Sequence, residues 1–296
     1  MRHRLFIFTV LASATVANAA TLDTNRIEQV TGVKGTWNAS EGVFKVTAPR
    51  NDVKVSVDGW TMPPFMGLAS WAAFTQQKAD DVMVMGDTVL FQDEVNPVMS
   101  AALDSGLSVT ALHNHFFFDE PKVYFMHISG AGDAVKLAGA VRKVWDKIRE
   151  VRAANPQPGK TFGLAAMPAT NSITGKGIEE ILGVKGQSNN GMFKVVIGRT
   201  TKMPCGCEMS KEMGVNTWAA FAGTDGDAVV DGDFAVLEDE LQPVLKSLRR
   251  AGVNIVAIHS HMTHENPRIL FLHYWGHGKA GELARALKRA LEAQAK

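Results

Sequence analysis

The chain repeats one pattern twice, and this repetition restricts the fold more than any other feature of the sequence. Leu112-His113-Asn114-His115 recurs as Ile258-His259-Ser260-His261. Earlier in each copy, Trp71-Ala72-Ala73-Phe74 recurs as Trp218-Ala219-Ala220-Phe221. Two copies that are each about the size of a small domain favour a pseudo-twofold pair over a solenoid of many short units.

The start of the chain has the three parts of a secretory signal peptide. Met1-Arg2-His3-Arg4 is positively charged, Leu5 to Val16 is apolar, and Ala17-Asn18-Ala19 supplies a small-x-small cleavage site. We therefore expect residues 1–19 to be removed and the mature protein to be periplasmic or secreted. No cysteine follows the apolar run, so a lipid anchor is not expected.

The rest of the chain divides into three segments. We expect a first repeat domain at residues 20–150, a linker at 151–171 and a second repeat domain at 172–296. The linker begins with Asn155-Pro156-Gln157-Pro158-Gly159-Lys160, which is rich in turn-forming residues.

The charge balance excludes two classes of partner. Loss of Arg2 and Arg4 with the signal peptide turns the formal net charge of +1 into −1, with His neutral. This balance gives no reason to expect nucleic acid or an anionic membrane surface as partner. Beyond the signal segment, no stretch is long and uncharged enough to insert into a membrane. The sequence leaves the oligomeric state open.

The two cysteines lie in the second copy alone. Cys205 and Cys207 are too few and too close in sequence to form a disulfide framework. Four readings stay open: a local disulfide, a redox couple, a pair of soft metal ligands, or a turn whose thiols happen to be near each other.

The second part of each copy predicts secondary structure most clearly. In the first copy, Glu94-Val95-Asn96-Pro97 opens a helix that Gly106 closes, strands follow at 107–115 and 122–129, and a second helix begins after Asp133. Further strands are expected around 44–46, 53–57, 71–74 and 83–91, with Trp71 and Trp218 in the core. This order predicts an α+β fold: two homologous copies of an antiparallel sheet with helices packed on it, related by a pseudo-twofold axis.

The repeated histidines predict a metal site. Residues i and i+2 of a strand point to one face, so each His-x-His presents two imidazoles to a divalent transition metal, zinc first, with copper, nickel or iron as alternatives. A third His on the next strand joins them only if the register allows it. The candidate ligands are His113, His115, His127, Asp119 and Glu120 in the first copy and His259, His261, His264, Glu265 and His273 in the second.

Two other interpretations assign purely structural roles to these polar residues. The histidines could be buried and hydrogen-bonded to backbone carbonyls, with the acid and the proline only shaping a turn. Glu94 and Glu240 stand at matched helix starts, where a carboxylate caps the helix; the catalytic alternative is a general base or a partner of a ligating His. Capping is the favoured interpretation of these two.

These residues carry a family resemblance. The stretch from His113 to His127, its counterpart ending Phe271-Leu272-His273-Tyr274-Trp275-Gly276, and the Gly-x-x-x-Trp-Ala-Ala-Phe segments that start at Gly67 and Gly214 resemble the LppY/LpqO-type family. The resemblance covers essentially the whole mature chain. It implies an exported bacterial protein and supplies no established activity. Many relatives are lipoproteins, so the missing lipobox cysteine implies a free periplasmic or secreted protein here.

Three classes of function remain open. The chain is a metal-dependent enzyme, with hydrolysis as the expected reaction, or a non-catalytic metal-handling protein, or a pseudo-dimeric binding protein for a small molecule or envelope ligand. Paired histidines at the base of an open pocket would favour the enzyme. A closed site with four ligands would favour metal handling, and histidines that point apart would favour the binding protein.

Overall fold

The computed structural model describes residues 22–78, 81–163, 166 and 168–294. The expected signal peptide lies outside the described residues. In the part of the chain that is described, no helix is long and apolar enough to cross a membrane.

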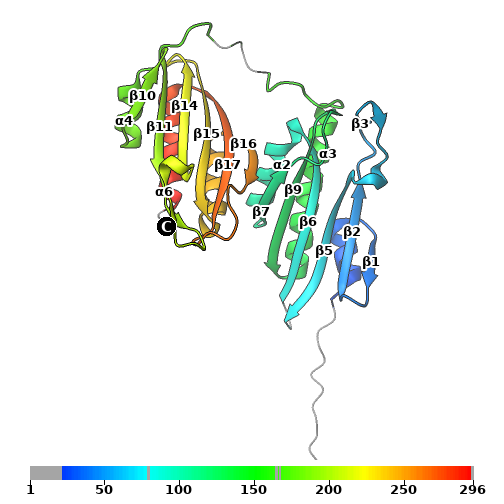
Figure 1. The fold of residues 1–296 in the computed structure, drawn as a ribbon. Coiled ribbons are helices and arrows are strands. Elements are labelled where there is room, and N and C mark those ends of the chain that lie inside the picture. The colour runs from blue at the N-terminus through cyan, green and yellow to red at the C-terminus, as the bar shows by residue number, and fades with distance from the viewer. Residues whose placement is uncertain (1–21, 79–80, 164–165, 167, 295–296) are drawn as a thin grey trace, which may run out of the picture.

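Both halves of the chain have the same order of elements, except that the short strand β8 of the first half has no counterpart in the second (Figure 1). The first half consists of α1 (Thr24–Thr31), β1 (Gly35–Asn38), β2 (Val43–Pro49), β3 (Ser56–Val57), β4 (Trp60–Thr61), the 3-10 helix η1 (Pro64–Met66), β5 (Ala69–Lys78), β6 (Asp81–Phe91), α2 (Gln92–Asp104), β7 (Ser108–His113), β8 (Asp119–Glu120), β9 (Val123–Gly132) and α3 (Ala134–Ala154). The second half consists of α4 (Gly175–Leu182), β10 (Gly186–Asn189), β11 (Met192–Gly198), β12 (Thr201–Lys202), β13 (Glu208–Met209), the 3-10 helix η2 (Lys211–Met213), β14 (Asn216–Gly223), β15 (Ala228–Leu237), α5 (Glu238–Arg250), β16 (Asn254–His259), β17 (Ile269–Gly278) and α6 (Ala280–Gln294).

The long strands form one antiparallel sheet across both halves. Its 12 strands run in the order β1-β2-β5-β6-β9-β7-β16-β17-β15-β14-β11-β10, which is a palindrome in terms of equivalent strands. At its centre β7 pairs with β16 through Leu112 and Ile258, which are equivalent positions of the two copies. A pseudo-twofold axis therefore passes between these two residues. The α+β fold with an internal duplication is confirmed.

The helices cover one face of the sheet and leave the other face open. Strand residues such as Val84 and Val230 pack with helical residues such as Val144 and Leu287 in one continuous hydrophobic core. Trp71 and Trp218 were expected in this core, but both are half-buried. They alternate with the core positions Ala72 and Ala219, so they lie on the open face, and that expectation is wrong.

Several elements differ from the sequence-based prediction at their ends. Helix α2 begins at Gln92, two residues before Glu94, and β7 ends at His113 rather than at His115. Helix α3 continues to Ala154, into the range expected for the linker. Helix α1 was not predicted, although Asp23 caps its N-terminus by accepting from the backbone N–H of Arg26.

The two halves also exchange side-chain contacts that obey the pseudo-twofold symmetry. Each central strand contains a register shift, between Val109 and Ala111 in β7 and between Ile255 and Ala257 in β16. Asn96 of α2 accepts from the N–H of Ile255 at 2.7 Å and donates to its carbonyl at 3.1 Å. Gln242, the equivalent residue of α5, makes the same pair of bonds with Val109 at 2.9 and 2.8 Å. Each half thus satisfies backbone groups of the other.

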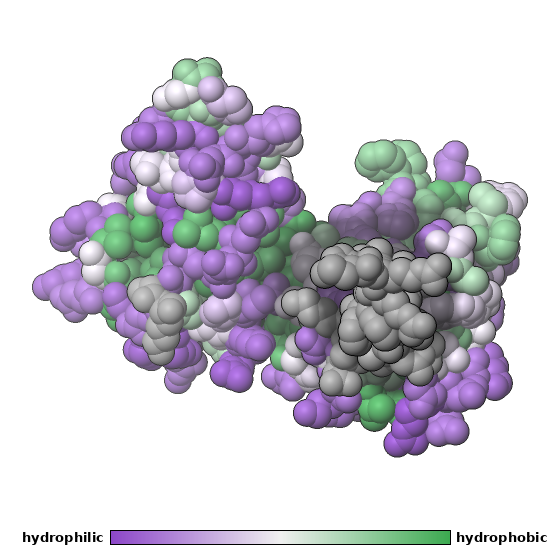
Figure 2. Space-filling view, turned by 90° about the horizontal axis from the view of Figure 1, so that it is seen from below, coloured by the Kyte–Doolittle hydropathy of each residue, from purple (hydrophilic) through white to green (hydrophobic). Residues whose placement is uncertain are grey.

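The space-filling view shows the outline of the molecule and the polarity of its surface. In Figure 2 the halves form two lobes, and hydrophilic side chains cover most of the visible surface of the lobe on the left. The open face of the sheet is not bare, because two small clusters cover its ends. One lies around Phe91 and Phe125 in the first half, and the other around Ala235 and Phe271 in the second.

Candidate metal centre

The strand register brings tryptophan, aspartate and histidine into one row on the open face. In the second half, Trp218 of β14 lies opposite Asp233 of β15, which lies opposite His273 of β17. In the first half Trp71, Asp87 and His127 form the same row on β5, β6 and β9. Directly opposite residues of an antiparallel sheet share a face, so each row is a continuous strip of one indole, one carboxylate and one imidazole.

The paired histidines stand at the end of this strip. His259 is the last residue of β16 and lies opposite Phe271, two residues before His273, so both histidines face the open side. Their rings stack with centroids 4.9 Å apart and an interplanar angle of 7°. His261 follows in the turn, where its ring stacks on Phe271 at 3.4 Å between centroids. The strand register therefore places His273 on the same face as His259, which the sequence alone could not decide.

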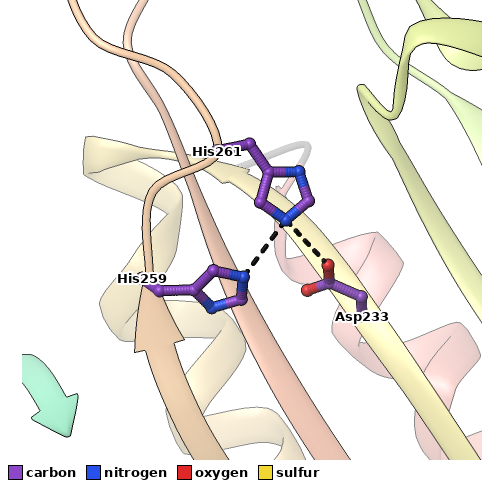
Figure 3. Close-up of side chains that lie close together, drawn as sticks. All are labelled: Asp233, His259 and His261. Carbon is purple, nitrogen blue, oxygen red and sulfur yellow. Dashed lines mark hydrogen bonds and ion pairs between the residues drawn. The ribbon is translucent and has the colours of Figure 1, made fainter.

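Asp233, His259 and His261 converge in the second half (Figure 3). The two Nε2 atoms are 3.1 Å apart, and Nε2 of His261 is 3.4 Å from Oδ2 of Asp233. One ligand atom from each residue lies within 4.8 Å of the others. Two nitrogens bound to one tetrahedral zinc at ~2.0–2.1 Å are about 3.3–3.4 Å apart, so the spacing of the imidazoles fits a shared ion.

The aspartate is buried and only partly satisfied. The side chain of Asp233 is 4% exposed, and its Oδ1 has no hydrogen-bond partner among the described residues. Burying a carboxylate without partners is costly, and a bound cation would offset that cost. Asp87 is 7% exposed and repeats the feature, with its Oδ1 likewise unpartnered within the described ranges.

The electrostatics favour the neutral form of His259 and His113. Burial lowers the pKa of His259, and the nearby His273 and His261 lower it further against the opposing effect of Asp233. Burial and the neighbouring histidines also hold the pKa of His113 below its ordinary value. A neutral ring with a free lone pair is the form that ligates a metal.

His273 is placed as a neighbour of this cluster. Its Nδ1 lies 3.2 Å from the carbonyl of Gly232, and because a carbonyl oxygen only accepts, Nδ1 is the donor of this hydrogen bond. It is not one of the three residues whose ligand atoms meet within 4.8 Å. The ring also lines a cavity of about 380 Å³ between the halves, together with Tyr124, Phe162 and Trp275.

The first half holds a looser version of the site. Nε2 of His113 is 3.1 Å from Nε2 of His115, and the His113 and His127 rings stack with centroids 5.2 Å apart. His115 stacks on Phe125 at 3.3 Å between centroids, as His261 stacks on Phe271. In the part of the chain described, however, only the second half brings three such ligand atoms within 4.8 Å.

The structure places the acidic candidates of the turn elsewhere. Asp119 accepts from the N–H of Val123 at 2.6 Å and from Lys122 Nζ at 3.0 Å, and Glu265 accepts from the N–H of Ile269 at 3.2 Å. Both buried carboxylates therefore hold the turn that leads into the next strand. That turn contains a cis peptide bond in each copy, before Pro121 and before Pro267.

The remaining two turn candidates are exposed and lie outside the cluster. Glu120 is exposed and lies 3.8 Å from Lys160. His264 is also exposed, at a left-handed backbone position with φ 69° that Phe118 occupies in the first copy with φ 55°. Neither residue belongs to the group whose ligand atoms converge.

Glu94 and Glu240 form ion pairs and hydrogen bonds at the starts of their helices. Glu94 binds Nη1 and Nη2 of Arg50 at 2.8 and 2.9 Å and accepts from the N–H of Phe91 at 2.8 Å. Glu240 binds Arg199 and accepts from the N–H of Leu237 at 2.8 Å. Both carboxylates therefore cap their helices and bind an arginine, which agrees with the interpretation of these residues as helix caps.

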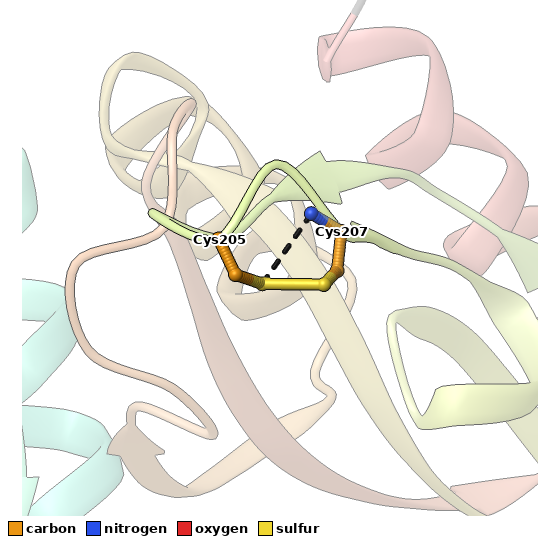
Figure 4. The surroundings of a disulfide bond; sticks show 2 residues. All are labelled: Cys205 and Cys207. Carbon is orange, nitrogen blue, oxygen red and sulfur yellow. Dashed lines mark hydrogen bonds between the residues drawn. A yellow bond between two sulfur atoms is a disulfide. The ribbon is translucent and has the colours of Figure 1, made fainter.

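The cysteines form a disulfide in the hairpin between β12 and β13 (Figure 4). This hairpin bonds to the turn of the second histidine site. Lys202 exchanges two backbone hydrogen bonds with Asn266, at 3.1 and 2.9 Å, and Thr201 Oγ1 donates to the carbonyl of Pro267 at 2.7 Å. The disulfide thus stiffens a support of the turn, and the first copy has no counterpart.

Asp87 and Asp233 are members of the sites that the sequence pattern does not single out as ligands. A signal existed, because Gly86-Asp87 and Gly232-Asp233 are part of the repeat. The register that carries each aspartate to the third histidine was missing, since pairing partners across a sheet are not encoded by spacing along one strand.

The fold and the site define a class: a duplicated α+β protein with a cluster of histidines and one aspartate on the open face of each half. The chain belongs to the family described as Domain of Unknown Function (DUF1259), whose model matches residues 25–147 and again residues 176–293. No curated protein matches the chain.

Two of the solved structures that have some likeness to the chain are shell proteins. The double ringed trimeric shell protein MSM0271 from the RMM microcompartment is 9% identical, with a TM-score of 0.21, and the match covers 74% of this chain and 85% of that one. The trimeric bacterial microcompartment shell protein PduB is 11% identical, with a TM-score of 0.22 and coverage of 88% and 89%. Likenesses at these TM-scores carry no conclusion about this chain.

Proposed function

We propose that the second half binds a divalent transition metal, zinc first, through Asp233, His259 and His261. The observation that carries the proposal is the convergence of these three side chains, one of them a buried carboxylate with an unpartnered oxygen. Three protein ligands leave a coordination position for water or substrate, as in catalytic zinc sites. The site opens to a cavity of about 610 Å³, which His261 and Asp233 help to line.

Of the three classes of function, this arrangement favours the metal-dependent enzyme. A hydrolytic reaction needs a metal position open to water and room for a substrate beside it. The first half, with its looser cluster of Asp87, His113, His115 and His127, is proposed as a weaker parallel site.

Metal analysis tests the proposal. The mature protein, loaded with zinc at neutral pH and dialysed, should retain metal when measured by inductively coupled plasma mass spectrometry. H259A/H261A should lose the metal of the second half. H264A is the matched control, because His264 is an exposed histidine of the same turn outside the cluster, and it should retain the metal. Wild-type protein that retains no zinc, copper, nickel or iron above background would sink the proposal.

We also propose that the chain is one of the LppY/LpqO-type exported proteins within its family, acting in the periplasm or outside the cell. The support is the signal-like start of the sequence and the repeated His-x-His, acid-x-Pro and Trp-Ala-Ala-Phe segments. Edman sequencing of protein from the envelope fraction should begin close to Ala20. A sequence that begins at Met1 would contradict export by cleavage.

A further inference from the structure

A cavity of about 610 Å³ adjoins the proposed metal site of the second half. Asp233 and His261 line it together with Trp218, and its lining also includes three lysines, Lys185, Lys194 and Lys211. The cavity lies on the open face of the sheet, because Trp218 and Asp233 are opposite each other in the row described above. A molecule in this cavity would contact the proposed ligands directly.

One of the three lysines is available to a ligand. Lys185 lies 2.8 Å from Glu179, and Lys211 lies 3.1 Å from Glu212. Lys194 instead places its Nζ 4.3 Å from the centroid of the Trp218 ring, and it makes no ion pair within the described residues. The ammonium group is therefore held beside the cavity without a carboxylate to neutralise it.

The same lysine–tryptophan pair occurs in the first half. Nζ of Lys45 lies 4.4 Å from the centroid of the Trp71 ring, and Trp71 is opposite Asp87. The surroundings have diverged, since Lys211-Glu212 at the start of η2 corresponds to Pro64-Phe65 at the start of η1. Both copies thus retain a lysine, an indole, an aspartate and histidines in one arrangement, while the residues at the starts of η1 and η2 differ. That retention indicates that the lysine and the site act together.

The charges decide which ligand fits. A divalent cation held by one carboxylate and two neutral imidazoles leaves a net charge of about +1, and Lys194 adds a second positive charge. A partly enclosed positive site attracts anions, and the part of the Trp218 indole that Lys194 does not cover offers an apolar surface next to them.

We propose, building on the metal site proposed above, that the second half binds a small organic anion. Its carboxylate or phosphate group contacts Lys194, its apolar part lies against Trp218, and it reaches the metal held by Asp233, His259 and His261. The ligand class follows from the one unpaired cation and the indole, both repeated in the first half.

Calorimetric titration of the zinc-loaded full-length mature protein tests this. The probes are phenyl phosphate, benzoate and benzyl alcohol, which share a phenyl ring and differ in charge. We expect one or both anions to bind at least tenfold more tightly than the alcohol. In K194Q the preferred anion should bind roughly tenfold more weakly, which is the scale of one charge-assisted contact. The preferred anion then distinguishes a phosphate ligand from a carboxylate ligand.

Two further variants keep the result interpretable. K194R retains the charge and should retain anion binding. K176Q removes a lysine of α4 that is 85% exposed and outside the cavity, and it should bind like the wild type. Zinc content, measured in every variant, should not change.

The outcomes separate this inference from the metal proposal. Protein that binds zinc but shows no preference for anions, or a preference that survives K194Q, overturns the anion site and leaves the metal site standing. Protein that binds no zinc overturns the metal site. The same titrations on zinc-free protein then show whether the cavity binds anions by itself. A preference for anions that depends on Lys194 supports the anion site, and the absence of that preference overturns it.

Discussion

At the scale of single residues, the buried position of Asp233 carries a cost in stability. It is nearly inaccessible to solvent, and one of its oxygens lacks a partner among the residues described. Residues that reduce the stability of the folded state in this way are typical of functional sites, where binding offsets the cost. Replacing Asp233 should therefore affect stability and metal binding in opposite directions.

Asp233→Asn tests that opposition. In zinc-free protein the variant should be at least as stable as the wild type in urea denaturation, because an unpaired buried charge is removed. Zinc at 100 times its Kd should stabilise the wild type by about 2.7 kcal/mol and the variant far less. Asp231→Asn is the matched control, since Asp231 is an exposed carboxylate two residues away on the same face. Equal stabilisation of both variants by zinc would contradict the role of Asp233.

Glu240 gives a prediction on pH. Burial raises its pKa, but the hydrogen bonds from Arg199 and the Leu237 amide outweigh burial, so the pKa lies below its ordinary value. A carboxyl with a lowered folded-state pKa contributes stability above its unfolded pKa of ~4.3, and that contribution is lost as the pH falls. Glu240→Gln should therefore flatten the loss of stability below about pH 4.5, measured as the denaturation midpoint against pH.

Glu94 should behave in the opposite way. Burial raises its pKa above the ordinary value despite the ion pair with Arg50. A raised folded-state pKa makes stability fall as the pH rises through the range between the unfolded and folded values. Glu94→Gln should remove a pH dependence of that sign, and the same sign for both variants would show that the two helix starts are electrostatically alike.

At the scale of elements, close strand packing positions the aspartate. A Cβ atom at Gly232 would lie 2.1 Å from Tyr274 Oη and 2.4 Å from the carbonyl of Trp218, and that carbonyl accepts a hydrogen bond from Tyr274 at 2.8 Å. Tyr274 is fully buried, so it has little room to move. The glycine before Asp233 thus allows β14, β15 and β17 to approach one another closely.

Gly232→Ala should destabilise the protein by about 1–3 kcal/mol, the usual cost of overpacking. Because the strain arises next to Asp233, zinc binding should weaken as well. Gly226→Ala is the control, since a Cβ there meets nothing within 4 Å. Thermal unfolding and zinc titration of both variants provide the measurement. Unchanged stability of Gly232→Ala would show that the strands can separate at little cost.

The sequence could predict the elements more readily than the contacts between them. The order of α2, β7, β9 and α3 follows from glycine and proline signals and from apolar periodicity, which are local properties. The facing of His127 and His273 depends on strand register and on a bulge in each central strand, which are tertiary properties. The contribution of Asp87 and Asp233 to the sites could not be predicted from the sequence for the same reason, because a single carboxylate in a strand also fits a solvent-facing position.

At the scale of the whole molecule, the reciprocal amides join the two halves. Asn96 and Gln242 each make two hydrogen bonds with the backbone of the opposite half, and Arg249 of α5 adds a bond to Ser100 of α2 at 3.1 Å. Burial lowers the pKa of Arg249 to about 10, which reflects how far this boundary is shielded from water. The halves are therefore expected to unfold together.

Asn96→Ala and Gln242→Ala should each reduce the free energy of unfolding by about 1–3 kcal/mol, because buried backbone groups lose their partners. Hydrogen exchange locates the effect: Asn96→Ala should speed exchange at the Ile255 amide, and Gln242→Ala at the Val109 amide. Each variant is the control of the other. Exchange that rises at both amides in both variants would show general loosening and not reciprocal contacts.

The pairing of Leu112 with Ile258 has a consequence for the history of the chain. Equivalent residues meet at the axis, so a single ancestral half already carried both sides of the contact and could associate with a second copy of itself. Fusion of two such genes end to end would have made that homodimer permanent and freed each half to mutate separately. The disulfide hairpin of one descendant and the exposed Phe65 of the other are then marks of this divergence around a shared inheritance.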